Sequence, residues 1–388
     1  MAERSLPLAG LRVVEVGTVI AGPFAGSLLA DQGAEVVKVE NPGAVDPLRE
    51  MGAKWNGVPL WWGVGVRGKR LVSLNLKHPE GKALLEKLAV EADVLVENYR
   101  PGALDRLGLG WKQLSALNPR LIMLSITGFG QTGPYGPRPG FGKIAEGMSG
   151  MVPLTGRSDD KPVHVGFSLA DTATGLLGFF ALSVALWNRD FGSGKGTHID
   201  LALYESLLRI LDCQFALNRD AGRGPERQGT DDPYGWGSRT EAVHQALRTA
   251  DGRWLKVVHA SAAALRQTAG CIAHGEADAA GAVAAWAARR PIEEAARKLI
   301  AAGAAAAPVF DGLSIAAERY FRERRDTIPA VADAAGPSWT PGPIWREGAR
   351  EDMPGFRSAT LGRDNAEVLG RLGASAADLD RLRSEGAI

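Results

Sequence analysis

The chain is 388 residues long, enough for two domains or for one large domain with a substantial buried core. It carries 45 Lys and Arg residues against 44 Asp and Glu, so its formal net charge of +1 gives no overall field that would attract nucleic acid or an anionic membrane. The two cysteines, Cys213 and Cys271, lie far apart and lack metal-ligand spacing, which argues against a zinc site or a disulfide framework and fits a reducing cytoplasm.

The first ten residues, MAERSLPLAG, lack the apolar core of a signal peptide. The longest apolar run, 176–187, is shorter than the roughly 20 residues that a membrane-crossing helix needs, so we expect a buried helix of a soluble protein. The histidines are scattered without HExxH or i, i+4 pairing, and no metal site is predicted.

Short strands and helices alternate along the first half of the chain. A strand at 11–16, a helix at 22–32 and a strand at 34–40 form a βαβ unit. The elements expected after it are a helix at 81–92, a strand at 94–97, helical turns within 104–117, strands at 120–127 and 197–202, and a helix near 204–217. This alternation predicts an α/β fold with a Rossmann-like, doubly wound, mostly parallel sheet.

The composition changes near residue 219. The stretch 219–238 is rich in Gly, Arg and Asp, which is typical of a linker or an ordered active-site loop. An Ala-rich region follows, with a strand at 254–259 and helices around 277–302, and it predicts a smaller α/β domain. The tail, 361–388, carries two amphipathic helical patterns with capping signals.

Asp171 is the most informative single residue. The segment 163–175, VHVGFSLADTATG, predicts a strand that passes into a helix over 172–187, with Asp171 at the helix N-terminus. A carboxylate there is either an N-cap, worth ~1 kcal/mol, or a covalent nucleophile that the helix end keeps ionised. Position alone favours the cap.

A nicotinamide site has to be considered, because the first βαβ unit contains Gly17, Gly22 and Gly26 and ends on Glu40. The glycines are too widely spaced for the GxGxxG fingerprint, and Pro23 lies among them, so an NAD or FAD site is disfavoured. The Gly-rich segment 128–142 has no GK[ST] and is therefore not a P-loop; a mobile loop over a ligand fits it better.

Seven segments, taken in order and spacing, form a wider pattern than any single motif. They are LAGLRVVEVGTVIAGPFAGSLLADQGAEVVKVENPG (8–43), SLNLKHPEGKALLEKLAVEADVLVENYRPGALDRLGLGW (73–111), LNPRLIMLSITGFGQTGPY (117–135), GFSLADTATG (166–175), GKGTHIDLALYES (194–206), TADGRW (249–254) and LGRDNAEVLGRLG (361–373). Together they resemble the family III CoA-transferases, which include formyl-CoA transferase, carnitine CoA-transferase and the related α-methylacyl-CoA racemases.

The resemblance implies that Asp171 is the nucleophile, with capping as a second role. Its carboxylate would attack an acyl-CoA thioester and pass through an aspartyl anhydride and an aspartyl-CoA thioester. Backbone N–H groups of Gly128 and Gly130, or of Gly235 and Gly237, are expected to stabilise the oxyanions. The CoA contacts implied by matching motifs are Val19, Ile20, Lys77, Asn98, Tyr99 and Arg106. Without the resemblance, each of these could be an ordinary surface, turn or packing residue.

The resemblance also implies partners and an assembly. An acyl-CoA and a carboxylic acid are the expected substrates, with succinyl-CoA and a small dicarboxylate as a reasonable pair, and neither a metal nor a tightly bound cofactor is expected. A homodimer of interlocked chains is implied, with the first part of the large domain at 1–220, a linker and small domain at 221–325, and a return linker and C-terminal part at 326–388.

Two departures from the family pattern stand out. Gly142 follows Phe141 where a GFD segment is common, and Arg363 with Asp364 replaces an acidic-His pair. We expect these changes to leave the nucleophile alone while weakening the case for oxalate or formate. A racemase needs a His where this chain has Phe141, and a phenyl ring cannot carry a proton. A CoA-binding protein without turnover is the alternative from another class.

Overall fold

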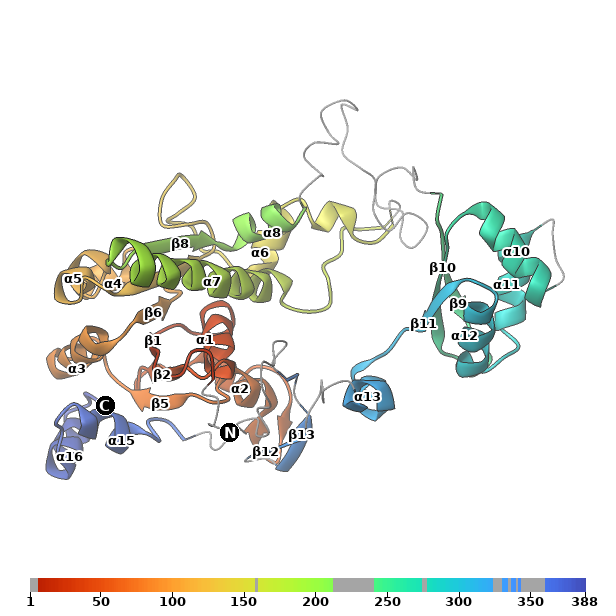
Figure 1. Ribbon diagram of the computed structural model, residues 1–388. Helices are drawn as coiled ribbons and strands as arrows, with labels where there is room; N and C mark the ends of the chain where they lie inside the picture. The colour runs from red at the N-terminus through yellow and green to blue at the C-terminus, as the bar shows by residue number, and fades with distance from the viewer. Residues whose placement is uncertain are drawn as a thin grey trace. The chain divides into compact units, whose positions relative to one another are not determined.

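The computed structural model describes residues 6–157, 160–211, 241–273, 278–323, 330–333, 336–339, 341–342 and 360–388 (Figure 1). The chain forms two compact units. The large unit comprises Met1–Ser149, Val165–Ile210 and Tyr320–Ile388, and the small unit comprises Gly150–His164 and Leu211–Arg319. Three stretches of the sequence therefore build the large unit, including the C-terminal tail.

A six-stranded parallel sheet forms the centre of the large unit, as the sequence predicts. Its strands are β1 (Arg12–Glu15), β2 (Glu35–Glu40), β5 (Arg70–Ser73), β6 (Val94–Glu97), β7 (Ile122–Thr127) and β8 (His198–Ala202). Their order is β5-β2-β1-β6-β7-β8, which is the order of a Rossmann sheet. The order in which successive strands are added reverses between β1 and β6. The sequence analysis missed β5, because four residues between polar neighbours give little periodic signal.

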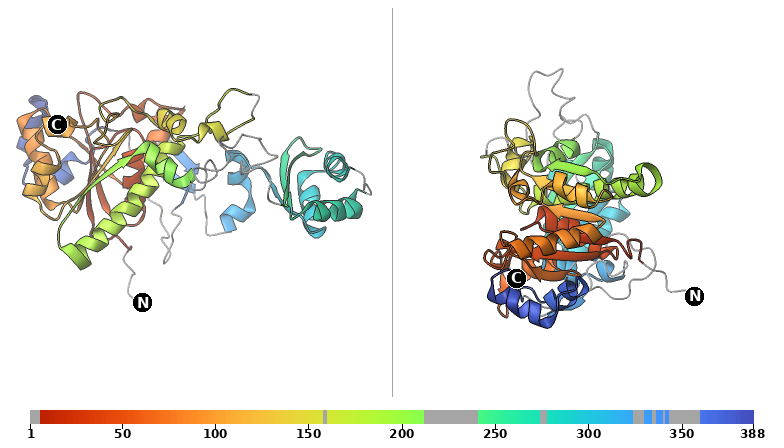
Figure 2. Two further views of the ribbon diagram at one scale, coloured as in Figure 1. Left: turned by 90° about the horizontal axis from the view of Figure 1, so that it is seen from above. Right: turned by 90° about the vertical axis from the view of Figure 1, so that its left-hand side faces the viewer.

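Helices cover both faces of this sheet (Figure 2). On one face lie α3 (Pro79–Glu91), α5 (Trp111–Leu117), α15 (Asn365–Arg371) and α16 (Ala376–Ser384), whose leucines share a core with Val14, Val37 and Leu95 of the strands. On the other face lie α1 (Ala21–Asp31) and α7 (Leu169–Asn188). Because both faces are covered, the strands are buried on both sides rather than alternating between buried and exposed residues.

Helix α7 differs from its prediction in two ways. It begins at Leu169, with Ser168 at the N-cap position, and residues 161–165 before it form no strand. It is also not buried all round: Gly178 packs against Leu124 of β7, whereas Phe180 and Trp187 are 65% and 67% exposed. By length and composition alone Leu169–Ser193 could cross a membrane, a property that helices in soluble cores share. The expected fully buried helix is therefore wrong, and one apolar face of α7 lies open in the single chain.

The C-terminal segment covers the edge strand β5. The backbone N–H of Leu71 donates to Asp364 Oδ2 at 2.7 Å, and the N–H of Asp364 donates back to the Leu71 carbonyl at 2.9 Å. Ser73 N–H donates to Asn365 Oδ1 at 2.9 Å, and Arg363 pairs with Asp364 at 2.7 Å. The departure at Arg363 and Asp364 thus satisfies the backbone of an edge strand that would otherwise be open to pairing.

The small unit contains a three-stranded antiparallel sheet in the order β11-β10-β9. Its strands are β9 (Val243–Arg248), β10 (Trp254–His259) and β11 (Ala305–Pro308), covered by α10 (Ala262–Ile272), α11 (Ala279–Ala287) and α12 (Ile292–Ala301). Leu255, Val257, Val283 and Leu299 form its core, which is fully excluded from solvent.

The remaining elements are short. They are η1 (Pro47–Arg49), β3 (Lys54–Trp55), β4 (Val58–Pro59), α2 (Leu60–Gly65), α4 (Ala103–Arg106), α6 (Gly142–Met148), η2 (Val152–Leu154), the π-helical turn η3 (Arg189–Ser193), α8 (Leu203–Leu211), α13 (Gly312–Ala317), α14 (Arg319–Glu323), β12 (Ala330–Asp333) and β13 (Gly336–Trp339). Of these, α4 and α6 position residues of the site described next.

Candidate active site

The turns that follow β1 and β6 meet at the point where the strand order reverses. The N–H of Thr18 donates to Asn98 Oδ1 at 2.7 Å, and Asn98 Nδ2 donates to the Thr18 carbonyl at 2.8 Å. Ligands of open α/β sheets bind in the crevice outside the carboxyl ends of the strands at such a reversal. Val19, Ile20 and Tyr99 therefore lie at the expected edge, whereas the side-chain amide of Asn98 is already engaged in joining the two turns.

A pocket of about 140 Å³ opens beside Tyr99. Lys77 and Tyr99, both predicted CoA contacts, line it together with Glu40, whose carboxylate is already paired with Arg49, and with Val39, Asn41, Leu74, Leu76, Ala103, Leu104 and Leu107. Apolar walls with an aromatic side chain and a cation suit a flat heteroaromatic ring that carries phosphates.

The cations near this pocket are available to an anion. Lys77 is exposed and Arg106 lies exposed on α4, next to Leu107 of the pocket wall. Neither forms an ion pair with another residue in the part of the chain that the structure describes. The backbone of Tyr99 is fixed by Glu97, because the Tyr99 N–H donates to Glu97 Oε2 at 2.7 Å. Burial raises the pKa of Glu97 to about 7.

Asp171 is the third residue of α7 rather than its cap. Ser168 occupies the N-cap position, and its side chain makes no capping hydrogen bond. The Asp171 carboxylate packs against the backbone of Gly142, which is the first residue of α6. A Cβ added to Gly142 would lie 2.2 Å from Asp171 Oδ2. The expectation of a capping role is wrong, and the absence of a side chain at Gly142 leaves the space that the Asp171 carboxylate occupies.

The environment of Asp171 makes its carboxylate harder to ionise. Burial raises its pKa to about 6, and the nearby Glu146 adds to this, while its own backbone N–H and Lys143 act in the opposite direction. Burial, rather than the helix end, therefore sets this pKa. A carboxyl of pKa about 6 is still about nine-tenths ionised at pH 7, so the charged form remains available.

A lysine and a buried glutamate brace the segment that leads into α7. Lys143 Nζ donates to the carbonyls of Val165 and Phe167 at 3.0 and 2.7 Å, and it pairs with Glu146 at 2.9 Å. The Glu146 side chain is 1% exposed, so the ion pair fixes the Lys143 side chain to a buried residue of the same helix, α6. The sequence analysis missed this brace; its only local signal is the i, i+3 spacing of opposite charges.

Close packing of α7 on α1 brings Asp171 to the same edge as the β1 turn. A Cβ at Gly175 would lie 3.0 Å from the Ala21 carbonyl oxygen and 2.9 Å from the Phe24 ring. Asp171 and Gly175 are four residues apart on one helix and therefore share a face. The first turn of α7 consequently lies beside the start of α1, next in sequence to Val19 and Ile20.

Comparison with known proteins agrees with this arrangement. The model of the CoA-transferase family III matches residues 8–346, most of the chain. The chain belongs to CoA-transferase family III. The family predicted from the sequence is thus confirmed.

Curated relatives of this family III chain are named as CoA-transferases. It is 42% identical over 252 residues to the succinyl-CoA–D-citramalate CoA-transferase of Chloroflexus aurantiacus, an alignment that covers 65% of the chain and 61% of the relative. It is 40% identical over 259 residues to the succinate–glutarate CoA-transferase of Agrobacterium fabrum, covering 65% and 63%. The chain thus spans about three fifths of the length of the curated relatives it matches.

Solved structures share the fold over most of the chain. A CAIB/BAIF family protein from Brucella suis has a TM-score of 0.83 at 31% identity and covers 95% of this chain and 100% of its own. An aspartate-to-alanine mutant of Rv3272 from Mycobacterium tuberculosis has a TM-score of 0.76 at 26% identity, with the same coverage.

The loop glycines of this family III chain differ in what they are free to do. Gly128 packs directly on Gly140, since a Cβ at Gly128 would lie 2.5 Å from the Gly140 Cα. The N–H of Gly130 already donates to Thr127 Oγ1 at 2.9 Å. Gly235 and Gly237 lie outside the described residues. Gly128 therefore packs closely against the loop at Gly140. The N–H of Gly130 would have to give up its hydrogen bond to Thr127 before it could donate to an oxyanion.

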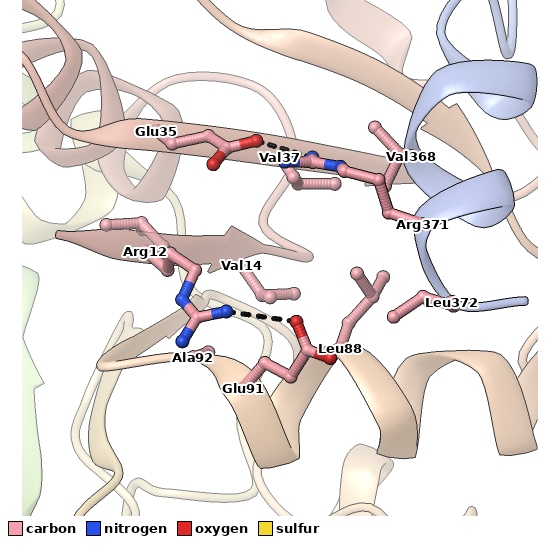
Figure 3. A pocket seen from close by; sticks show the side chains of 11 residues that line it. Arg12, Val14, Glu35, Val37, Leu88, Glu91, Ala92, Val368, Arg371 and Leu372 are labelled. Carbon is pink, nitrogen blue, oxygen red and sulfur yellow. Dashed lines mark hydrogen bonds and ion pairs between the residues drawn. The ribbon is translucent and has the colours of Figure 1, made fainter. Parts of the chain in front are cut away.

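A second pocket lies at the amino ends of β1 and β2, away from these residues (Figure 3). Arg12 pairs with Glu91 at 3.0 Å, and Arg371 of α15 pairs with Glu35. Since each arginine already has a carboxylate partner, this pocket offers no counterpart to Lys77.

Within the described residues no cluster of three or more His, Cys, Asp or Glu side chains has a metal-binding arrangement.

Proposed function

We propose that this chain is an acyl-CoA:carboxylate CoA-transferase in which Asp171 is the covalent nucleophile. The observation that carries the proposal is the position of Asp171: a half-buried carboxylate, largely ionised at pH 7, in a family III chain. It lies at the carboxyl edge of the parallel sheet, the edge at which Lys77 and Tyr99 line a pocket.

The proposed reaction proceeds by acyl exchange without proton transfer. An Asp171 carboxylate oxygen attacks the thioester carbonyl of the donor, the C–S bond breaks, and CoA leaves as a thiolate from an acyl-aspartyl anhydride. The thiolate attacks the Asp171 carbonyl carbon and releases the donor acid, which leaves an aspartyl-CoA thioester. The acceptor carboxylate then forms a second anhydride, and the thiolate attacks the acceptor carbonyl to give the new acyl-CoA and free Asp171.

The remaining roles follow the same division of the site. Lys77, Tyr99 and Arg106 are assigned to the nucleotide end of CoA, and Val19 and Ile20 to the path towards the thioester. Asn98 is assigned to holding the β1 turn in place, because its amide is engaged there. The oxyanions are assigned to backbone N–H groups of the glycine-rich loops around Gly128 and Gly235.

The proposed substrates are succinyl-CoA as donor and a small dicarboxylate as acceptor. The support is chemical consistency among the relatives, whose names combine succinyl-CoA or succinate with D-citramalate, L-malate or glutarate. All of these acceptors are short dicarboxylic acids. Exposed cations near the pocket and the near-neutral net charge are compatible with such anions.

A homodimer of interlocked chains is part of the proposal, with the cytoplasm as its compartment. The support is the open apolar face of α7 and η3, where Phe180, Trp187 and Phe191 are 65%, 67% and 74% exposed. Contiguous apolar surfaces of this kind mark interfaces on soluble proteins. Sedimentation of the full chain should give twice its mass of 41.0 kDa, and a monomer at micromolar concentration would contradict the dimer.

The decisive experiment follows an oxygen label. The chain is incubated with succinyl-CoA and an acceptor acid whose carboxylate carries ¹⁸O, and both the CoA esters and the peptide containing Asp171 are examined by mass spectrometry. In the proposed mechanism the oxygen that bridges the second anhydride stays on Asp171, so the peptide gains one ¹⁸O in a single turnover and up to two after repeated turnover. Transfer of CoA without this label would refute Asp171 as nucleophile. The Asp171→Ala variant is the control, and it should form no new CoA ester.

A further inference from the structure

Val19 has a backbone conformation that its residue type disfavours. Its φ is +63°, and among the described residues only Val19 and Asn56 combine a positive φ with a side chain. Asn tolerates this left-handed region, whereas a β-branched residue there is a genuine outlier. Strained residues of this kind persist only where their surroundings hold them, and they cluster at functional sites.

Two side chains hold the Val19 turn from opposite sides. The N–H of Val19 donates to Asp46 at 3.0 Å from Oδ1 and 3.2 Å from Oδ2. Its neighbour Thr18 is fixed by Asn98 through both backbone groups. Asp46 therefore binds the strained residue Val19 directly, whereas Asn98 binds its neighbour Thr18.

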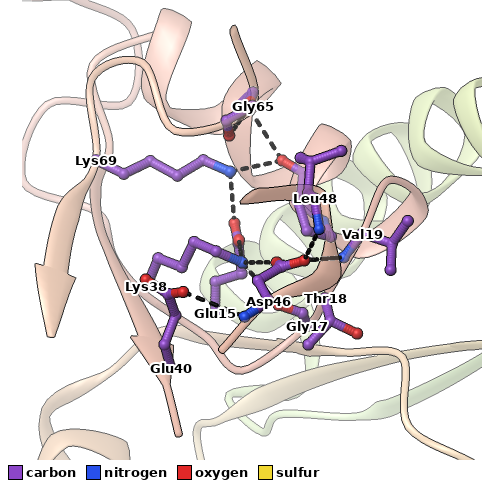
Figure 4. Close-up of polar contacts among 12 residues, drawn as sticks. Glu15, Gly17, Thr18, Val19, Lys38, Glu40, Asp46, Leu48, Gly65 and Lys69 are labelled. Atoms are coloured by element: carbon purple, nitrogen blue, oxygen red, sulfur yellow. Dashed lines mark hydrogen bonds and ion pairs between the residues drawn. The ribbon is translucent and has the colours of Figure 1, made fainter. Parts of the chain in front are cut away.

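A buried network fixes Asp46 in turn (Figure 4). Lys38 Nζ lies 3.0 Å from Asp46 Oδ2, 3.2 Å from Glu15 Oε1 and 2.8 Å from the Gly17 carbonyl, so it binds both the aspartate and the turn. Lys69 completes the network by pairing with the other oxygen of Glu15 at 2.8 Å. The side chains of these four residues are 0–1% exposed.

Such a network is a poor way to gain stability. Removing charges from water has a penalty that often exceeds their mutual attraction, and apolar replacements of similar volume are frequently as stable or more so. A buried network that is retained at a ligand edge and that holds an outlier residue is better explained by the conformation it imposes. We propose that Asp46, fixed by Lys38, is a positioning residue that keeps the Val19 turn in its left-handed conformation, and so shapes the path between the Tyr99 pocket and Asp171.

This inference rests on the proposed transferase function, and it makes a prediction that a merely structural role does not. Gly adopts a positive φ without strain, so Val19→Gly should raise the melting temperature. Such a variant keeps the left-handed turn without help from Asp46, so it is the background in which the role of Asp46 in the reaction of succinyl-CoA with a dicarboxylate acceptor is tested. Its affinity for CoA, measured by calorimetry, should stay within threefold, because the nucleotide pocket is intact.

The matched control is Asn56→Gly, at the other positive φ. Asn56 lies in the exposed turn between β3 and β4, so this variant should leave both kcat and CoA affinity unchanged. An Asp46→Asn enzyme with the kcat of the wild type would overturn the inference. A wild-type chain without any transferase activity would instead overturn the proposed function.

Asp46→Asn tests the other half of the inference. It keeps the shape of the side chain but removes the charge that Lys38 and the Val19 N–H share. Kcat should fall at least tenfold in the wild-type background but less than threefold further in Val19→Gly, because glycine keeps the left-handed conformation without Asp46. Equal losses in both backgrounds would contradict the coupling. If Asp46→Asn does not fold on its own, adding Val19→Gly should restore a folded chain, and a double variant that also fails to fold would contradict the inference.

Discussion

Adding one methyl group at Gly142 should disable the proposed nucleophile without harming the fold. A Cβ there would lie 2.2 Å from Asp171 Oδ2, whereas carbon and oxygen normally stay more than 3 Å apart, so the carboxylate has to move by about 1 Å. A misplacement of about 1 Å at a reacting group costs on the order of 10²-fold in rate. We therefore expect Gly142→Ala to lower kcat by about two orders of magnitude, with a much smaller change in KM for the acyl-CoA.

The control for this prediction lies in the same helix. Gly147 of α6 has nothing within 4 Å of the position its Cβ would take. Alanine favours a helix over glycine by about 1 kcal/mol, so Gly147→Ala should be at least as stable as the wild type and fully active. The assay is the initial rate of new CoA-ester formation, with thermal unfolding followed in parallel. A folded Gly142→Ala enzyme with the kcat of the wild type would refute the idea that Asp171 reacts from this position.

Four further predictions concern charge. Because only the ionised form of Asp171 attacks, kcat should rise with pH through an apparent pKa of about 6 and level off above pH 7, and a rate independent of pH from 5 to 8 would contradict this. Burial raises this pKa above its unfolded value of 3.8, so the native state binds the proton more tightly and loses stability as pH rises through 6. Asp171→Asn should therefore stabilise the chain by about 1–3 kcal/mol at pH 7 but not at pH 4, measured by denaturant unfolding. Lys77→Ala should raise KM for the acyl-CoA about tenfold at unchanged kcat, since a charge-assisted bond to phosphate contributes about 1.5–3 kcal/mol; Lys195→Ala, an exposed lysine outside the pocket, is its control. Lys143→Met should lower kcat and shift the pH profile upwards, because Lys143 both braces the segment before α7 and lowers the pKa of Asp171.

Much of the sheet could be predicted because its strands are buried on both faces. Continuous apolar runs such as 94–97 and 122–127 are visible without knowledge of their neighbours, and the alternation with helices then fixes a parallel arrangement. Strand β5 is different: it pairs with β2 on one side, and on the other side its Leu71 bonds to Asp364, which lies 293 positions further along the chain. A local pattern contains no information on such partners.

The same limit applies to the site. The sequence indicates which residue types are present at Lys77, Tyr99 and Asp171, but the contact between Gly142 and the Asp171 carboxylate depends on how α6 meets α7. The strain at Val19 is likewise invisible locally, because nothing in the sequence around a valine announces a positive φ. It arises from Asp46 and Lys38, which the chain supplies from other strands and turns.

The ionisation of Asp171 shows why position in a helix is not enough to predict chemistry. The helix end favours a negative charge by about 0.3–1 kcal/mol, and this effect fades within the first turn. Burial acts against it: the rise in pKa from 3.8 to about 6 corresponds to at most about 3 kcal/mol, so burial dominates. The result suits a nucleophile better than a cap, because a carboxylate with a pKa near 6 is more basic, and less firmly solvated, than one near 4, yet it remains mostly ionised at neutral pH. Relieving the burial should therefore lower both the apparent pKa and the reactivity of Asp171, and a variant that lowers the pKa while raising kcat would contradict this reasoning.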